Sequence, residues 1–307
     1  MWQYISGAFL GWSLGSNDAA NVFGTGVATN LVRYRTAVIL IAVFVILGAV
    51  LEGPKCILTL GGLSRVGSRL AFICTLAAGA VMFAMSRLGL PSSSSQAIVG
   101  AVFAAGLANG SADLSIFSKM VLCWILTPIG AALISVILYH VLGRIARPLL
   151  AHPVQRTRIL KSAILAAGCY GSYALGTNNV ANVSGIYVGS GQMSAGTASL
   201  FGGICIAAGV LTYGRRVMMT VGKDIFPLDA FTALIAVISQ AVTTHIFTQI
   251  GVPVSGSQAI VGAVIGIGLV KNLSALSGRK VTEILLGWVM TPVVSAAVCA
   301  GLMRLIG

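Results

Sequence analysis

Long apolar stretches make up most of this chain, and short polar motifs interrupt a few of them. A stretch of about 20 apolar residues is long enough for an α-helix to cross the hydrocarbon core of a bilayer. The pattern therefore predicts an all-α polytopic protein that crosses the cell membrane several times.

The first apolar stretch contains a polar motif, SNDAANVFGTG, which places Asn17, Asp18 and Asn21 in apolar surroundings. An ionised side chain is costly there, so such a residue usually faces a cavity and has a function. The simpler alternative is a structural Asp18 bonded to neighbouring backbone or to Asn17. Glycines flank the motif and permit a broken helix, whose freed backbone groups would need partners.

The chain also repeats itself. GSNDAANVFG from Gly15 matches GTNNVANVSG from Gly176, and PSSSSQAIVG from Pro91 matches PVSGSQAIVG from Pro253. WILTP from Trp124 likewise matches WVMTP from Trp288. Matches in the same order at nearly constant spacing indicate two homologous halves. We place the halves at 1–143 and 162–307, joined by a basic linker at 144–161. The second half carries Asn179 where the first has Asp18.

Composition supports the membrane prediction and explains the charge. The chain is 57% hydrophobic and 8% charged, with a mean hydropathy of +0.98, whereas a soluble domain has about a quarter of charged residues. The net charge of +13 comes from basic residues placed singly or in short clusters between apolar runs. This placement is typical of topology signals, so we expect no nucleic-acid partner.

The distribution of basic residues predicts the orientation. The linker at 144–161 is the most basic segment, which places it in the cytoplasm. The loop after the first polar motif carries Arg33 and Arg35, whereas the equivalent loop of the second half has no basic residue. We therefore expect two inverted repeats with both termini outside. A basic loop at Arg65 conflicts with the simplest version, so the number of crossings per half stays open.

Two serine motifs, PSSSSQ and PVSGSQ, each precede an apolar run that reads as a helix. A helix N-terminus presents free N–H groups and the positive end of its dipole, and it is suited to bind an anion. Serine hydroxyls and glutamine amides add donors. Ordinary helix capping by serine is the simpler reading, but the recurrence beside a polar motif in each half favours function.

Charge now constrains the mechanism. The polar and serine motifs contain neither Lys nor Arg, so a bound anion would be held by dipoles and hydroxyls while Asp18 repelled it. A cation between them, or protonation of Asp18, would remove the repulsion. Either case couples the anion to a cation, as a symporter requires. Asn179 has no charge, so the second half should hold a cation more weakly or not at all.

These motifs resemble those of the inorganic phosphate transporter (PiT) family, whose pattern is G-x-N-D-V-A-N and P-V-S-T-T-H in each half. The resemblance implies helical hairpins that reach the midplane and a phosphate site between two inverted halves. It also implies uptake driven by sodium or protons, with no other cofactor. It places the phosphate ligands at Asn17, Ser93, Ser94, Ser95, Asn178, Ser255, Gly256 and Ser257, with Gln96 and Gln258 secondary. It places the coupling cation, possibly a sodium ion near Asp18, at Asp18, Asn21, Asn179 and Asn182.

This chain departs from the family pattern at Asn179, and it has Ser-Gln instead of Thr-His in both serine motifs. A different ion stoichiometry, proton coupling, and transport of sulfate or another tetrahedral oxyanion therefore stay open, as does a homodimer. An anion channel is the alternative of another class. A membrane enzyme acting on phosphate esters is disfavoured, because no nucleophile, base or metal cluster converges in the sequence.

Overall fold

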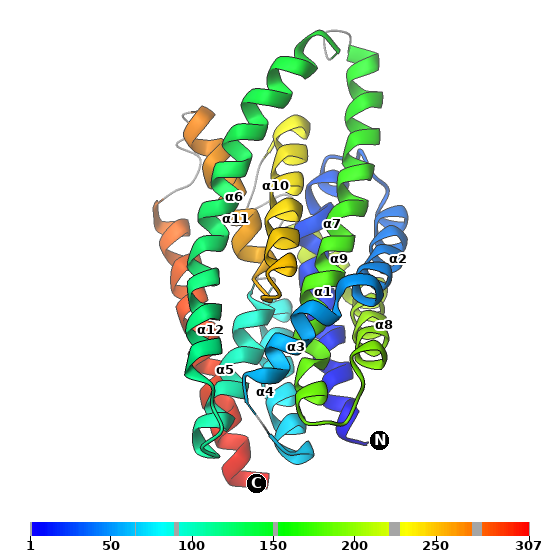
Figure 1. Cartoon of the computed structure of the whole chain (residues 1–307). Helices are drawn as coiled ribbons and strands as arrows, with labels where there is room; N and C mark the ends of the chain where they lie inside the picture. The colour runs from blue at the N-terminus through cyan, green and yellow to red at the C-terminus, as the bar shows by residue number, and fades with distance from the viewer. Residues whose placement is uncertain are drawn as a thin grey trace.

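The computed structural model describes residues 2–64, 66–88, 92–149, 153–220, 228–271 and 278–306 (Figure 1). Arg65 of the basic loop and Pro91 of the first serine motif lie outside these ranges. The described chain is a bundle of α-helices, which confirms the all-α prediction. The helices are α1 (Ile5–Ala28), α2 (Tyr34–Glu52), α3 (Pro54–Gly62), α4 (Ser68–Leu88), α5 (Ser94–Ala108), α6 (Leu114–Leu149), α7 (Pro153–Gly189), α8 (Ala195–Tyr213), α9 (Arg215–Thr220), α10 (Ala230–Gln249), α11 (Gly256–Lys271) and α12 (Gly278–Ile306), after a short 3-10 turn at Trp2–Tyr4.

Six helices are long and apolar enough to cross a membrane, on length and composition, within the described residues. They comprise α2, α4, α8 and α10 together with the segments Leu114–Ala146 of α6 and Leu285–Ile306 of α12. Large apolar side chains cover the outer surfaces of α6 and α12, where Leu133 is 60% and Val289 65% exposed. Such surfaces are suited to lipid rather than to water. The chain is thus a multi-pass membrane protein.

Two helical hairpins enter the bundle from opposite ends. The first is α4–α5 and the second is α10–α11, and Figure 1 shows α5 in the lower half of the molecule and α11 in the upper half. Their tips touch, because the Ser257 hydroxyl donates to the backbone oxygen of Ser92 at 3.0 Å. Both α5 and α11 therefore begin inside the protein, which favours the predicted re-entrant hairpins.

The expected breaks at the polar motifs are wrong, because α1 and α7 each run unbroken through theirs. The glycines there serve close packing instead. A Cβ on Gly15 would lie 2.0 Å from the backbone oxygen of Ile206, so only glycine lets α1 and α8 approach this closely. The interruptions fall elsewhere, at Gly53 between α2 and α3 and at Gly214 between α8 and α9.

Close helix contacts recur in equivalent pairs. Gly15 meets the backbone of Ile206 and Gly176 that of Val45, and the two contacts occupy equivalent places in the repeats. In the same way, Gly100 meets Pro292 while Gly262 meets Pro128. In Figure 1, α1 rises from the N-terminus whereas α7 descends. These features favour the inverted-repeat prediction. The linker residues 144–161 lie at the long upper ends of α6 and α7, except for 150–152, which fall outside the described residues.

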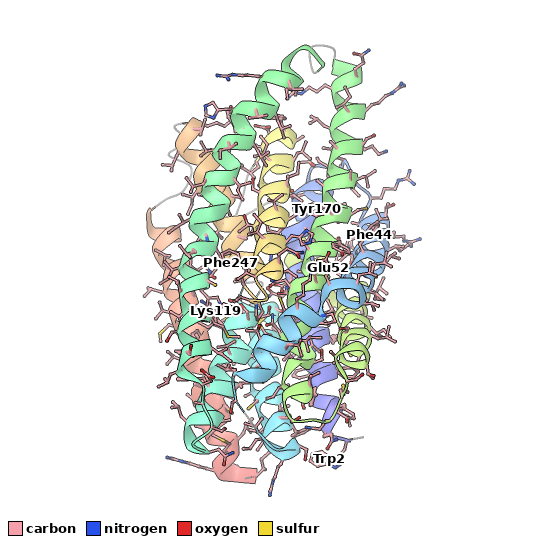
Figure 2. All side chains as sticks on the ribbon, in the orientation of Figure 1. Trp2, Phe44, Glu52, Lys119, Tyr170 and Phe247 are labelled. Carbon is pink, nitrogen blue, oxygen red and sulfur yellow. The ribbon has the colours of Figure 1, made fainter. Side chains whose placement is uncertain are left out.

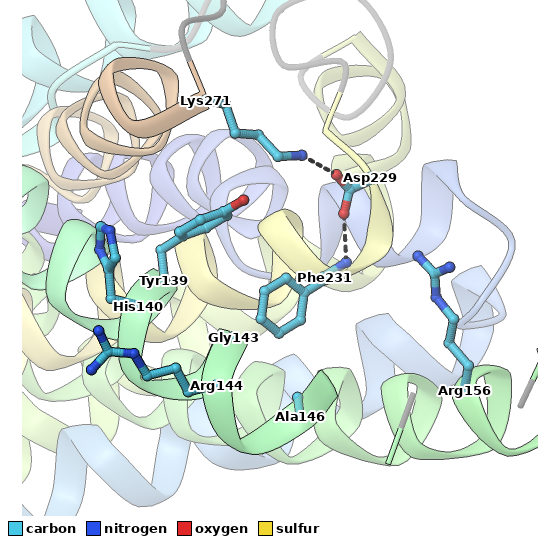
Figure 3. A pocket seen from close by; sticks show the side chains of 9 residues that line it. All are labelled: Tyr139, His140, Gly143, Arg144, Ala146, Arg156, Asp229, Phe231 and Lys271. Carbon is cyan, nitrogen blue, oxygen red and sulfur yellow. Dashed lines mark hydrogen bonds and ion pairs between the residues drawn. The ribbon is translucent and has the colours of Figure 1, made fainter. Parts of the chain in front are cut away.

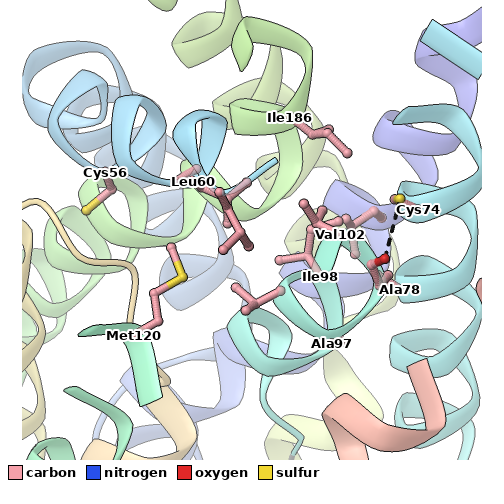
Figure 4. Close-up of a cluster of buried hydrophobic side chains, with 14 of the residues drawn as sticks. Cys56, Leu60, Cys74, Ala78, Ala97, Ile98, Val102, Met120 and Ile186 are labelled. Carbon is pink, nitrogen blue, oxygen red and sulfur yellow. Dashed lines mark hydrogen bonds between the residues drawn. The ribbon is translucent and has the colours of Figure 1, made fainter. Parts of the chain in front are cut away.

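The apolar core has two parts on either side of the hairpin tips. One joins α1, α7, α10 and α11, and the other joins α3, α4, α5 and α12. Figure 4 shows the second part, where the Cys74 thiol lies 3.6 Å from the Ala101 backbone oxygen. Cys56, Cys123 and Cys299 are also buried and free of disulfides, as expected of small packing residues.

Candidate functional site

The polar residues of both halves meet where the two hairpin tips touch the middles of α1 and α7. Helix α1 brings the first polar motif and α7 the second, and the hairpins bring the two serine motifs. Every predicted side chain is at most 4% exposed. The set comprises Asn17, Asp18, Asn21, Ser93, Ser94, Ser95, Gln96, Asn178, Asn179, Asn182, Ser255, Ser257 and Gln258, and Gly256 is buried with them.

Asp18 lies at the junction of the two halves. Its Oδ2 accepts a hydrogen bond from the Asn179 amide at 2.9 Å and one from the Ser94 hydroxyl at 3.2 Å. Asp18 takes part in none of the ion pairs found among the described residues. A buried carboxylate without a positive partner is costly, so the position favours a bound cation or a proton.

The asparagines of one half contact the serines of the other. The Asn21 amide donates to the Ser257 hydroxyl at 3.1 Å, and the Asn182 amide donates to the Ser94 hydroxyl at 3.4 Å. Asn182 also donates to the Asn179 carbonyl oxygen at 3.2 Å. Each half thus contributes to a site that neither half could form alone.

Asn17 and Asn178 hold the hairpin loops. The Asn17 carbonyl oxygen accepts from the backbone N–H of Ser92 at 3.3 Å, and that of Asn178 accepts from Val254 at 2.8 Å. These contacts are equivalent in the two halves. The Asn178 amide donates in addition to the Thr248 hydroxyl at 3.1 Å. Both side chains therefore position the serine motifs, and their direct contact with a substrate stays a prediction.

The serine at the third position of each motif caps one of the two inner helices. Ser93 Oγ accepts from the backbone N–H of Gln96 at 3.3 Å, and Ser255 Oγ accepts from that of Gln258 at 3.2 Å. This is the capping that the simpler reading expected. It also fixes the N-termini of α5 and α11 toward the junction, so capping and anion binding are compatible roles.

Several buried amide groups have unused hydrogen-bonding atoms within the described part of the chain. Asn21 and Asn182 each have an unpartnered carbonyl oxygen, and so do Gln96 and Gln258. These form two pairs that are equivalent in the repeats. Gln240 of α10 has both its amide nitrogen and its oxygen unpartnered. Our sequence reasoning missed Gln240, because it belongs to no repeated motif and is one of several polar residues in α10.

A second polar cluster ties α10 to α2, α3 and α7 at mid-height, where Figure 2 labels Glu52 and Tyr170. Glu52 accepts from the Lys55 ammonium at 2.8 Å and from the Tyr173 hydroxyl at 2.5 Å. His245 lies 3.3 Å from the same carboxylate and 2.9 Å from the Tyr170 hydroxyl. The cluster stands outside the predicted site and braces the second hairpin against its neighbours.

A cavity of about 670 Å³ opens between the upper ends of the helices (Figure 3). Lys271 pairs with Asp229 at 2.5 Å beside it, while Arg144 and Arg156 add positive charge. The cavity therefore presents a basic surface at the end of the molecule that carries the linker. It is lined by Tyr139, His140, Gly143, Arg144, Ala146, Arg156, Asp229, Phe231 and Lys271.

Known proteins share this organisation. A model of the phosphate transporter family matches residues 14–299. A predicted phosphate permease of Methanocaldococcus jannaschii is 30% identical over 95% of this chain and 93% of its own length. The sulfate permease CysP of Bacillus subtilis is 29% identical over 94% of this chain and 83% of its own length. A solved structure titled as the sodium-dependent phosphate transporter superposes with a TM-score of 0.84 over 99% of this chain and 98% of that one. At 22% identity this shows a shared fold.

Proposed function

Because this chain belongs to the phosphate transporter family, we propose that it imports inorganic phosphate by symport with sodium or protons, through alternating access. The observation that carries the proposal is the position of Asp18. This buried carboxylate contacts Ser94 of one anion motif and Asn179 of the opposite half. An anion bound at the serines would face it directly, so anion and cation binding become interdependent.

The anion is held by the two inner helices. The N-termini of α5 and α11 supply backbone N–H groups and positive dipole ends, and Ser93, Ser94, Ser95, Ser255 and Ser257 supply hydroxyl groups around them. Asn17 and Asn178 hold the two serine motifs in place through hydrogen bonds to the backbone of the hairpin loops. The absence of Lys and Arg from these motifs keeps anion affinity moderate, which suits a site that must also release its cargo.

The coupling cation takes the neighbouring position. Carboxylate and amide oxygens are hard ligands suited to sodium, and Asp18 lies beside two amides whose carbonyl oxygens are unpartnered, those of Asn21 and Asn182. A proton on Asp18 would equally remove the repulsion. Since Asn179 replaces the second carboxylate, we expect one tightly bound cation per cycle.

Alternating access follows from the two-hairpin construction. The tips meet at Ser92 and Ser257, so separating the halves on either side of this contact would expose the site to that side. We propose that 1–143 and 162–307 act as two inverted repeats in the cell membrane. The linker at 144–161 would be cytoplasmic and both termini outside.

Sulfate is the second candidate substrate, since CysP is nearly as similar as the phosphate permease. The test is uptake of labelled phosphate into proteoliposomes under a sodium gradient and then a proton gradient, with excess sulfate as competitor. Uptake that one gradient drives and sulfate does not suppress would support phosphate symport and name the ion. Complete suppression by sulfate, or no uptake under either gradient, would contradict it.

The Asp18→Asn variant separates a symporter from an anion channel. We expect gradient-driven phosphate uptake to fall at least about ten-fold, since interactions with a charged partner contribute roughly 1.5–3 kcal/mol. The amide keeps the side-chain volume, so the bundle should purify as before. Flux that is unchanged in the variant would indicate a channel, which needs no cation at this position.

A further inference from the structure

We propose that Gln240 of α10 belongs to the oxyanion site and that its carbonyl oxygen accepts a hydrogen bond from a protonated oxygen of the substrate. The site would then select phosphate, which keeps an O–H group at neutral pH, over fully deprotonated oxyanions such as sulfate. This inference rests on the proposed function and names the substrate group that the site distinguishes.

The first observation is that Gln240 is buried with nothing to bind. Its side chain is 0% exposed, yet neither its amide nitrogen nor its carbonyl oxygen has a hydrogen-bond partner in the described structure. A buried amide is costly unless it is paired. A core position would be better filled by an apolar side chain, so the amide points to a partner that is bound during function.

The second observation is where the amide lies. A Cβ built on Gly256 would be 3.5 Å from the Gln240 amide nitrogen and 3.9 Å from that of Asn21. Gly256 is the first residue of α11, between Ser255 and Ser257. The Gln240 amide is therefore aimed at the N-terminus of α11, one of the two positions where we place the anion.

Comparison of the two repeats shows that the pair of Gln240 and Gly256 belongs to the second half and has no counterpart at the aligned positions of the first. When the two serine motifs are aligned, Gly256 stands where the first half has Ser94. Extended without a gap, the same alignment pairs Gln240 with Ala78, a buried residue that carries no polar group. The first half therefore offers a hydroxyl beside Asp18, while the second offers an open glycine beside an amide. The asymmetry orients the substrate in the site.

Chemistry identifies the group that such an amide recognises. An amide presents both a donor and an acceptor, and both are free here, so the argument does not depend on which atom is nitrogen. An oxyanion oxygen can accept from the donor. The acceptor needs an O–H group, which phosphate keeps at neutral pH and sulfate lacks. A neutral acceptor also avoids the repulsion that a carboxylate such as Asp18 would add.

The test compares protonated and deprotonated competitors in proteoliposomes. Labelled phosphate uptake by the wild type and by Gln240→Met is measured against increasing arsenate, which carries an O–H group, and against sulfate, which does not. We expect the variant to raise the KM for phosphate roughly ten- to hundred-fold and to lose the preference for arsenate over sulfate. Ser239→Ala is the matched control, because the Ser239 hydroxyl donates only within α10, to the Ile235 backbone oxygen.

A second variant keeps the inference testable if Gln240→Met folds poorly. Gln240→Glu keeps an acceptor, so it should bind phosphate more weakly but still prefer arsenate to sulfate. Equal competition by both anions in this variant would overturn the inference. So would an unchanged KM and an unchanged preference in Gln240→Met. Failure of the proposed function is distinct, because the wild type itself would then take up no phosphate under either gradient.

Discussion

The pairing of Asp18 with Asn179 makes a prediction at the scale of single residues. Asn179→Asp would place a second carboxylate about as near to Asp18 as the present 2.9 Å amide contact. Two carboxylates so close cannot both stay ionised unless cations neutralise them, so a second carboxylate calls for a second cation. We expect the variant to depend more steeply on the coupling cation, with a Hill coefficient rising from about one toward two.

The matched control moves the charge instead of adding one. Asp18→Asn combined with Asn179→Asp keeps a single carboxylate in the other half, so its cation dependence should stay as shallow as in the wild type. Initial uptake rates over a range of cation concentrations measure both variants. An Asn179→Asp protein with the cation dependence of the wild type would show that position 179 does not contact the cation.

Which residues of the candidate site could be recognised from the sequence depends on whether their motifs are repeated in the two halves. The motifs of Asp18 and of the serines could be recognised from the sequence because each occurs twice and because polar residues are rare in apolar stretches without a function. Their roles in binding stay predictions. Gln240 could not be recognised, since it belongs to no motif and its importance depends on the open space at Gly256. The positioning roles of Asn17 and Asn178 could not be predicted from the sequence either, because they arise from contacts with loop residues 75 and 76 positions away.

At the scale of helices, the close contact at Gly15 predicts a large effect of one methyl group. In Gly15→Ala the new Cβ would lie 2.0 Å from the Ile206 backbone oxygen, so α1 and α8 would have to separate. Overpacking of this kind costs about 1–3 kcal/mol, and the apparent melting temperature in detergent should fall by several degrees.

Gly196→Ala is the control, since a Cβ on this helical glycine meets nothing within 4 Å. Alanine there should stabilise α8 slightly, by up to about 1 kcal/mol. Size-exclusion profiles after heating would measure both variants. A Gly15→Ala protein as stable as the wild type would mean that the two helices are not packed as closely as described.

The cap of α10 predicts a dependence of stability on pH. Burial raises the pKa of Asp229, but hydrogen bonds from Lys271 and from the Thr232 backbone outweigh it and lower the pKa below 3.8. A lowered pKa stabilises the folded state above about pH 4 and ceases to do so as the pH falls through the folded-state value.

Asp229→Asn keeps a good capping side chain and removes the charge (Figure 3). We expect it to be less stable than the wild type at pH 7, by under about 1 kcal/mol, because the ion pair is partly exposed. The difference should shrink as the pH falls below about 4 and through the folded-state pKa of Asp229. Melting curves from pH 7 downward measure it, and a difference that stays constant as the pH falls would exclude the charge as its cause.

Helix continuity marks a limit of sequence interpretation. Glycines beside a polar motif fit a broken helix and a tightly packed one equally well, and only the neighbouring helix decides between them. At Gly15 and Gly176 the neighbours are the backbones of α8 and α2. The starts of α5 and α11, by contrast, were predictable, because proline disfavours a continuing helix and serine is a preferred helix cap before each apolar run. The hairpins themselves were implied by the family resemblance.

For the whole molecule, the basic cavity near the linker predicts an effect on the rate of anion entry. Arg144 and Arg156 border it (Figure 3), and charged clefts raise the local concentration of oppositely charged ligands. The double variant Arg144→Gln with Arg156→Gln should slow phosphate entry from that side several-fold at low salt. The effect should disappear near 1 M salt, where charges are screened within about 3 Å.

Arg35→Gln serves as the comparison, because this arginine at the start of α2 does not line the cavity. Proteoliposomes with the linker side facing the label report the effect, and those with the other side facing it should show none. A loss of rate that is independent of salt would indicate a packing defect instead of steering.

The single carboxylate at the junction has a consequence for the electrical behaviour of the protein. If Asp18 stays with the protein and recruits one monovalent cation for each dihydrogen phosphate, the cargo carries no net charge across the bilayer. The membrane voltage would then neither assist nor oppose transport. Uptake would follow the chemical gradients alone, and the cell could take up phosphate equally well when its membrane is depolarised.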